Sequence, residues 1–165
     1  MAYAQETRLN RLPEDVPDRV HKLFDVWRAA TCGNALPDRK DLSSDTLSLW
    51  INDIGIYEYL PDRRDFVVRI DAPNMIAASG ENYQGCSPHQ IDLDFGTRVH
   101  ATLLDVIDSR QPAFHIIGVE RKVWEEWVRL LLPVQTRDRA GKAVLQILVA
   151  YFLCMHLFLS SGLPT

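Results

Sequence analysis

The sequence contains few cysteines, and they form no pattern. Only three occur among 165 residues, at Cys32, Cys86 and Cys154, and no two of them form a CxxC pair. An odd number of widely spaced cysteines argues against a disulfide framework and against a structural zinc site. The sequence therefore predicts free thiols in a reducing cytoplasm and no bound metal.

An excess of positive charge is also missing. Eighteen lysine and arginine residues stand against 22 aspartate and glutamate residues, which gives a net charge of −4. The densest basic cluster consists of three arginines within residues 62–71, and three aspartates are interspersed among them. Nucleic-acid binding normally needs a face that carries positive charge alone, so we expect no nucleic-acid partner.

The common catalytic motifs are absent, since the chain has no GxGxxG, GxxxxGK[ST], HExxH or GxSxG string. The histidines lack the short, regular spacing of a metal-ligand pair. They are His21, His89, His100, His115 and His156. These absences predict that the protein is not an enzyme. The alternative is a small enzyme in which His100 forms an acid–base pair with Asp92 or Asp94.

Long hydrophobic runs are missing as well. Residues 144–159 are nearly all apolar, but Gln146 and His156 interrupt them, and a spanning helix needs about 20 apolar residues. The first half of this segment is rich in strand-forming residues, so we expect a buried strand that continues into a short apolar tail. The N-terminal residues lack the charged start and apolar centre of a signal peptide. We therefore expect a cytoplasmic protein without a membrane partner.

What the chain does have is the composition of a globular domain, with 47% hydrophobic and 24% charged residues. Its length supports one domain with its own core. Residues 1–13 are polar and predict a loosely ordered leader, whereas residues 14–32 have the apolar periodicity of an amphipathic helix. The apolar stripe of this helix supplies candidates for a dimer interface, namely Val20, Leu23, Phe24 and Trp27.

The rest of the chain alternates between strand and helix patterns. The predicted elements are a short helix over 41–50, a hairpin over 54–60 and 66–70, a short helix over 72–78, a longer helix over 96–110, and strands over 113–120, 123–134 and 143–152. This order predicts an α+β fold, with short helices covering one face of a five-stranded antiparallel sheet. The irregular segment 71–90 is expected to close one side of a pocket.

Two pairs of residues fit either a site or the core. Asp92 and Asp94 lie on one side of a predicted extended segment just before the helix at 96–110, and we interpret them as helix caps. Trp124 and Trp127 are three residues apart, so they point to opposite faces of a strand. We assign Trp124 to a pocket and Trp127 to an outer dimer contact; core packing of both is the alternative.

Several short strings in collinear order carry a family resemblance. They comprise Trp27 and residues 35–39, 57–60, 66–70, 74–76, 83–85, 99–112, 129–134 and 144–151. Over residues 26–152 the chain thereby resembles the short standalone PAS-like domain family of alphaproteobacteria. The family usually carries Ala-Gly-Thr after the second strand, where this chain has Ala72, Pro73 and Asn74. If that turn shapes the pocket in the family, the pocket of this chain differs there.

The resemblance implies a sensory or regulatory module, because PAS domains bind small molecules between sheet and helices or serve as interaction modules. It implies a homodimer, a signalling partner, a small-molecule ligand of unknown identity, and three parts: residues 1–34 as leader and helix, 35–153 as PAS-like domain, and 154–165 as apolar tail. Candidates for the pocket lining are Met75, Ile76, Val99, His100, Leu103, His115, Ile117 and Trp124. A structural adaptor with a filled core is a further alternative.

Overall fold

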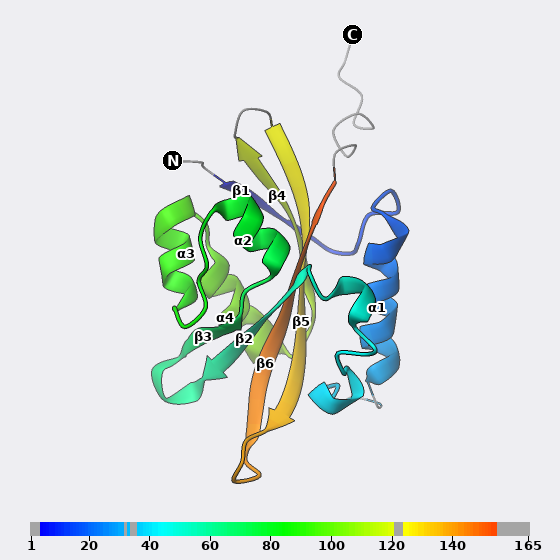
Figure 1. The fold of residues 1–165 in the computed structure, drawn as a ribbon, viewed down its shortest axis with the longest axis vertical. Coiled ribbons are helices and arrows are strands. Elements are labelled where there is room, and N and C mark those ends of the chain that lie inside the picture. The colour runs from blue at the N-terminus through cyan, green and yellow to red at the C-terminus, as the bar shows by residue number, and fades with distance from the viewer. Residues whose placement is uncertain (1–3, 32, 34–35, 121–123, 155–165) are drawn as a thin grey trace.

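Six strands pair into one open antiparallel sheet in the computed structural model, which describes residues 4–31, 33, 36–120 and 124–154 (Figure 1). The strands are β1 (Ala4–Leu9), β2 (Ile54–Leu60), β3 (Asp65–Ile70), β4 (Ala113–Glu120), β5 (Trp124–Arg137) and β6 (Ala143–Leu153). Their order across the sheet is β1-β4-β5-β6-β2-β3, so the sequence-adjacent strands β4, β5 and β6 form a meander beside the β2–β3 hairpin. The predicted α+β class and antiparallel sheet are confirmed.

The predicted strand count of five is wrong, because residues 4–9 form the edge strand β1 and not a loose leader. This strand pairs with β4 in a register that places Glu6 opposite Ile117 and Leu9 opposite Phe114. The apolar alternation that identifies a strand is missing here, because Glu6 and Arg8 stand at the positions where apolar residues would be expected. Polar, charged side chains on a short edge strand are common, since they discourage pairing with other chains.

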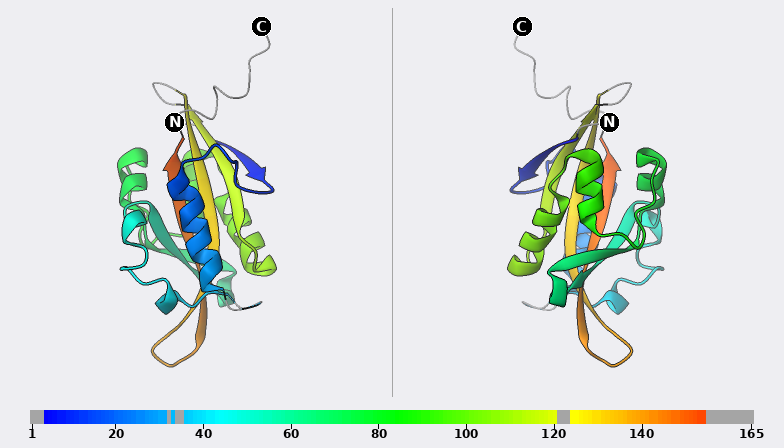
Figure 2. Two further views of the ribbon diagram at one scale, coloured as in Figure 1. Left: turned by 90° about the vertical axis from the view of Figure 1, so that its right-hand side faces the viewer. Right: turned by 90° about the vertical axis from the view of Figure 1, so that its left-hand side faces the viewer.

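Helices cover both faces of the sheet, and the prediction that they cover one face is wrong (Figures 1 and 2). The N-terminal helix α1 (Asp18–Ala30) lies on one face. The other face is covered by α2 (Pro73–Ser79), α3 (Pro88–Phe95) and α4 (Val99–Ser109). The reason lies in β5, where the consecutive side chains of Leu130, Leu131 and Leu132 are all fully buried. A central strand with apolar side chains on both faces needs cover on both.

The apolar stripe of α1 packs on the sheet of its own chain. Val20, Leu23 and Trp27 are buried there, and the Trp27 indole Nε1 donates a 2.9 Å hydrogen bond to the Pro133 carbonyl in β5. Phe24 is half-buried and stacks against Trp27. These four dimer candidates thus have partners within one chain, and a dimer contact through them would first require α1 to leave the sheet.

Helix α3 falls on the segment that the sequence analysis treated as irregular and then extended. Ser87 caps it by accepting a 3.2 Å hydrogen bond from the His89 amide, Pro88 occupies its first turn, and Gly96 ends it in the left-handed conformation. The predicted helix over 41–50 is reduced to two 3-10 turns, Arg39–Asp41 and Ser48–Trp50.

Cys86 and Cys154 carry free thiols, whereas Cys32 and residues 155–165 of the predicted tail lie outside the described residues. No helix among the described residues is long and apolar enough to cross a membrane.

The packing of α1 can be tested with Leu23→Ala. Removing this buried side chain should lower the free energy of unfolding by about 2–5 kcal/mol, since it leaves a cavity against the sheet. Lys22→Ala on the exposed side of the same helix should change it by less than about 0.5 kcal/mol. Urea unfolding at several protein concentrations measures both. A loss that grows as the protein is diluted would mean that Leu23 contacts a second chain.

Candidate functional site

A cavity of about 80 Å³ lies between the sheet and helices α2–α4. Its apolar lining comes from Met75, Ile91, Phe95, Val99, Ile117, Val119 and Trp127, with Ala4 at one edge. Its polar lining comes from Tyr57, Asp71, Ser79, Tyr83, Thr97, Arg129 and Tyr151. A mostly apolar hollow with a few polar groups is the usual form of a small-molecule site, although this one is small. Its volume suits several water molecules or a compact ligand.

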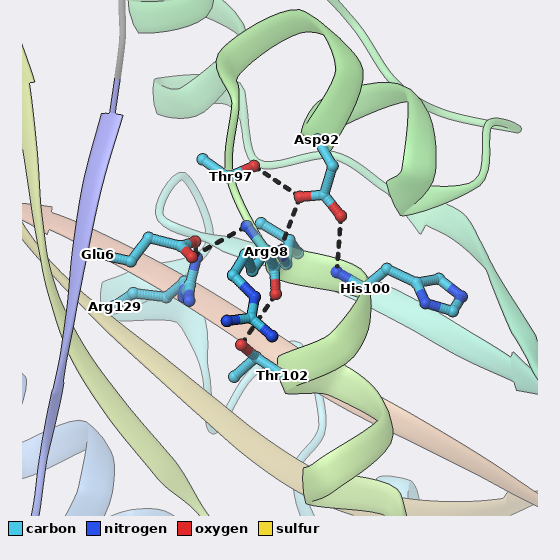
Figure 3. A network of polar contacts seen from close by, with 8 residues as sticks. Glu6, Asp92, Thr97, Arg98, His100, Thr102 and Arg129 are labelled. Carbon is cyan, nitrogen blue, oxygen red and sulfur yellow. Dashed lines mark hydrogen bonds and ion pairs between the residues drawn. The ribbon is translucent and has the colours of Figure 1, made fainter.

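The most unusual group in this cavity is the guanidinium of Arg129, which β5 places in the middle of the sheet. Arg129 is only 1% exposed, and its Nη1 donates a 2.8 Å hydrogen bond to Glu6 Oε1. The other oxygen of Glu6 accepts a 3.0 Å hydrogen bond from the Arg98 amide (Figure 3). Arg129 Nε and Nη2 have no hydrogen-bond partner among the described residues. The cavity therefore contains a buried cation with unused donors.

Two tyrosines lie beside this cation and remain neutral. Burial raises the pKa of Tyr57 well above its ordinary value. Burial also raises the pKa of Tyr151, and the adjacent Arg129 only partly offsets this effect. Burial opposes the charge of Arg129, but Tyr151 and Glu6 outweigh it, so the pKa of Arg129 is raised. The site thus combines one guanidinium cation with two neutral hydroxyl groups.

Asp92 fixes the N-terminus of α4 above the cavity. Its Oδ1 accepts hydrogen bonds from the Thr97 hydroxyl at 2.6 Å and from the Val99 amide at 2.7 Å. Its Oδ2 accepts one from the His100 amide at 3.0 Å (Figure 3). Amides in the first turn of a helix have no partner within the helix, so this carboxylate satisfies two of them. The interpretation of Asp92 as a helix cap is confirmed, although the residue itself lies in α3.

Asp71 and Tyr83 line another side of the cavity, and Asp94 binds Tyr83 from outside the lining. The Tyr83 hydroxyl donates a 2.8 Å hydrogen bond to Asp94 Oδ2, and the Tyr83 amide donates one of 3.0 Å to Asp71 Oδ2. Burial raises the pKa of Asp71. Burial and the bond to Asp94 raise the pKa of Tyr83. Asp94 therefore positions a neutral tyrosine, and the interpretation of Asp94 as a cap of the following helix is wrong.

One cluster outside the cavity has the residue types of a metal site. Ligand atoms of Asp65, His89 and His100 all lie within 4.8 Å of one another. The two imidazole rings stack face to face with centroids 3.6 Å apart, whereas metal-bound imidazoles point ring nitrogens at the ion. Asp65 Oδ1 already accepts hydrogen bonds of 2.7 Å from the Phe66 amide and the Ser87 hydroxyl. Metal binding here would therefore require the rings to turn.

The structure places three of the eight pocket candidates, Met75, Val99 and Ile117, in the cavity lining. The others lie elsewhere. Leu103 is fully buried in the core, Ile76 is half-buried, the His100 ring lies against Asp65 and His89, and His115 is buried beside Arg129 without lining the cavity.

The assignment of Trp124 to the pocket and Trp127 to the outer face is wrong. Trp127 lines the cavity, whereas Trp124 is 44% exposed on the opposite face. Trp124 covers Gly118, where a Cβ would come within 2.2 Å of its ring. The prediction that the two residues point to opposite faces holds, but the assignment of those faces was reversed because the sequence does not say which face carries the cavity.

Sequence reasoning missed Arg129, Glu6, Tyr57 and Tyr151. A signal for Arg129 was present, since it is the one charged residue within the apolar run 127–134. A charge in a strand that is buried on both faces must be paired or functional. Glu6 had no comparable signal, because it lies in the segment read as a leader.

Searches with this chain match no protein-family model, no curated protein and no solved structure.

Replacing Glu6 by Gln tests whether the buried ion pair supports the fold. The change leaves the Arg129 guanidinium without its counter-charge and should lower the free energy of unfolding by about 3 kcal/mol. The double variant Glu6→Gln/Arg129→Met removes both charges and should recover most of this loss. Gln5→Ala, at an exposed position of the same strand, is the control. Denaturant unfolding measures the stability of each variant. If Glu6→Gln is as stable as Gln5→Ala, the ion pair does not support the fold.

His115 should make stability depend on pH. Burial, followed by the charges of Arg129 and Arg8, lowers the pKa of His115 from 6.5 to about 3. Between these values the unfolded chain binds a proton that the folded chain does not, so stability decreases as the pH falls through this window. His115→Gln should therefore lose less stability than the wild type on acidification from about pH 6.5. Urea unfolding at a series of pH values checks this, and parallel curves would contradict it.

Proposed function

We propose that this protein is a non-catalytic sensory or regulatory module that binds a small molecule in the cavity between the sheet and helices α2–α4. The observation that carries this proposal is an apolar hollow containing a buried cation with unused hydrogen-bond donors. Unsatisfied buried donors cost free energy, and a bound acceptor would remove that cost. In a ligand-free adaptor these two donors would stay unsatisfied, although Arg129 would still pair with Glu6.

The arrangement of the elements supports a PAS-like character for this module. Strands β2 and β3 form a hairpin, helices α2–α4 follow, and β4–β6 form a meander that pairs back onto β2. Strand β1 is an addition to this arrangement. Pro73, at the departure from the family pattern, begins α2, and this helix contributes Met75 and Ser79 to the cavity. The turn that differs from the family therefore shapes the pocket wall.

A module without catalysis must act through contacts with other proteins, so the proposal includes a signalling partner and a homodimer in the cytoplasm. Ligand binding can reach the surface through Glu6, which connects the cavity cation to the edge strand β1. The enzyme alternative has less support, since the His100 ring and Asp92 do not line the cavity.

Native mass spectrometry of freshly purified protein tests the proposal directly. We expect a retained small molecule, and a higher melting temperature when that molecule is added back, because a ligand of the folded state stabilises it by mass action. Ile117→Phe, which fills the cavity, should abolish both effects. Ile116→Phe, on the opposite face of β4, should preserve them. If the wild type carries no ligand, and no compound in a broad small-molecule screen raises its melting temperature, the protein is an adaptor.

A further inference from the structure

We propose that the cavity ligand is a small monocarboxylate with a compact apolar body, held through its two oxygens by the Nε and Nη2 edge of Arg129. This inference rests on the proposed function, because it names the chemical class of the molecule that the cavity binds. The observations that support it are the geometry of the Arg129 side chain and the groups around it.

The unused donors of Arg129 lie on one edge of its guanidinium. Glu6 takes a hydrogen bond from Nη1, which leaves Nε and Nη2 as the unpartnered pair. A guanidinium is planar, and two of its N–H groups can point in parallel at the two oxygens of a carboxylate. A single acceptor, such as a ketone or an ether, would satisfy one of these donors and leave the other unpaired.

No residue within the described parts of the chain satisfies this edge. Glu6 accepts from Nη1 through Oε1 and from the Arg98 amide through Oε2, and neither oxygen makes a hydrogen bond to Nε or Nη2. The Tyr151 hydroxyl lies close enough to the guanidinium to raise its pKa, but its position does not meet the distance and angle of a hydrogen bond to Nε or Nη2. The donors are fully buried, and they lie on the side chain that lines the cavity.

A ligand carboxylate would share the positive charge of Arg129 with two nearby acidic groups. The acidic groups near Arg129 are Glu6 and Asp71. Glu6 is stabilised by two hydrogen bonds, and burial raises the pKa of Asp71, which makes that carboxyl easier to protonate. The Tyr57 and Tyr151 hydroxyls are neutral and can donate to a carboxylate. A ligand with two carboxylates would place its second charge against apolar walls.

The apolar lining of the cavity determines what the rest of the ligand can be. Phe95, Val99, Ile117 and Trp127 offer aliphatic and aromatic surface without further charge. The volume of about 80 Å³ leaves room for a short aliphatic chain, but not for a cofactor such as haem or flavin. The ligand is therefore a small acid whose apolar part is buried with its carboxylate.

The experiment compares acids with amides of the same shape. Isothermal titration and thermal-shift measurements use acetate, isobutyrate, isovalerate and benzoate, each with its amide. An amide has an NH2 group in place of the second oxygen, so it cannot offer one oxygen acceptor to each of the two parallel donors. We expect at least one acid to bind and to raise the melting temperature, and its amide to bind about tenfold or more weakly.

Two variants assign the effect to Arg129. Arg129→Lys keeps the positive charge beside Glu6 but loses the paired donors, so it should weaken binding of the acid about tenfold. Arg137→Lys, at an exposed position of the same strand, should bind like the wild type. If Arg129→Lys does not fold, as circular dichroism would show, Glu6→Gln/Arg129→Met provides an uncharged replacement that should bind neither acid nor amide.

The outcomes separate this inference from the proposed function. If a copurified or added small molecule binds in the cavity but Arg129→Lys does not weaken it, the ligand class is wrong and the binding module stands. Equal binding of acids and amides also overturns the inference. If Ile117→Phe and the wild type both carry no ligand and no acid binds, the proposed function and this inference fail together.

Discussion

The ion pair between Arg129 and Glu6 is the interaction on which the site depends. A guanidinium buried in the middle of a sheet is costly unless a counter-charge and hydrogen bonds compensate for the lost water. Glu6 supplies both from β1, the strand at the edge of the sheet, and also accepts the amide of Arg98 at the start of α4. One carboxylate thereby connects the edge strand, the central strand β5 and the helix that covers the cavity.

The two apolar faces of the sheet have different roles. One face carries α1, whose stripe packs closely on β5 and β6, and the Trp27–Pro133 hydrogen bond fixes its position. The other face is covered by α2–α4, which leave the cavity over Arg129. A change at the cavity can reach α1 through the sheet or through Asp53, which contacts Arg19 of α1 and Asn74 of α2. The edge strand β1 is the shorter route to the surface, since Glu6 belongs to it.

Much of the fold was predictable, because it follows from periodicity. Strand β2 and strand β4 have the bounds expected from their residue patterns, and the run Leu130–Leu132 explains why both faces need cover. The missed strand β1 has a particular cause, which is that charge on a buried face hides a strand. Glu6 made β1 look like a polar leader, and only the tertiary pairing with Arg129 accounts for its burial. The face of each tryptophan was likewise undetermined, because alternation fixes opposite sides but not which side encloses the cavity.

The same arrangement gives ligand binding a means of changing the structure. Arg129 has a fixed number of donors, and Glu6 uses only one of its nitrogens. A ligand carboxylate on the free edge would share the positive charge with Glu6 and weaken the attraction that holds β1. Edge strands belong to the less stable parts of a fold, where small changes in free energy shift local opening. Under the proposed binding, occupancy of the cavity is therefore coupled to the docking of β1 and to the loop before α4, because both are held by the same carboxylate.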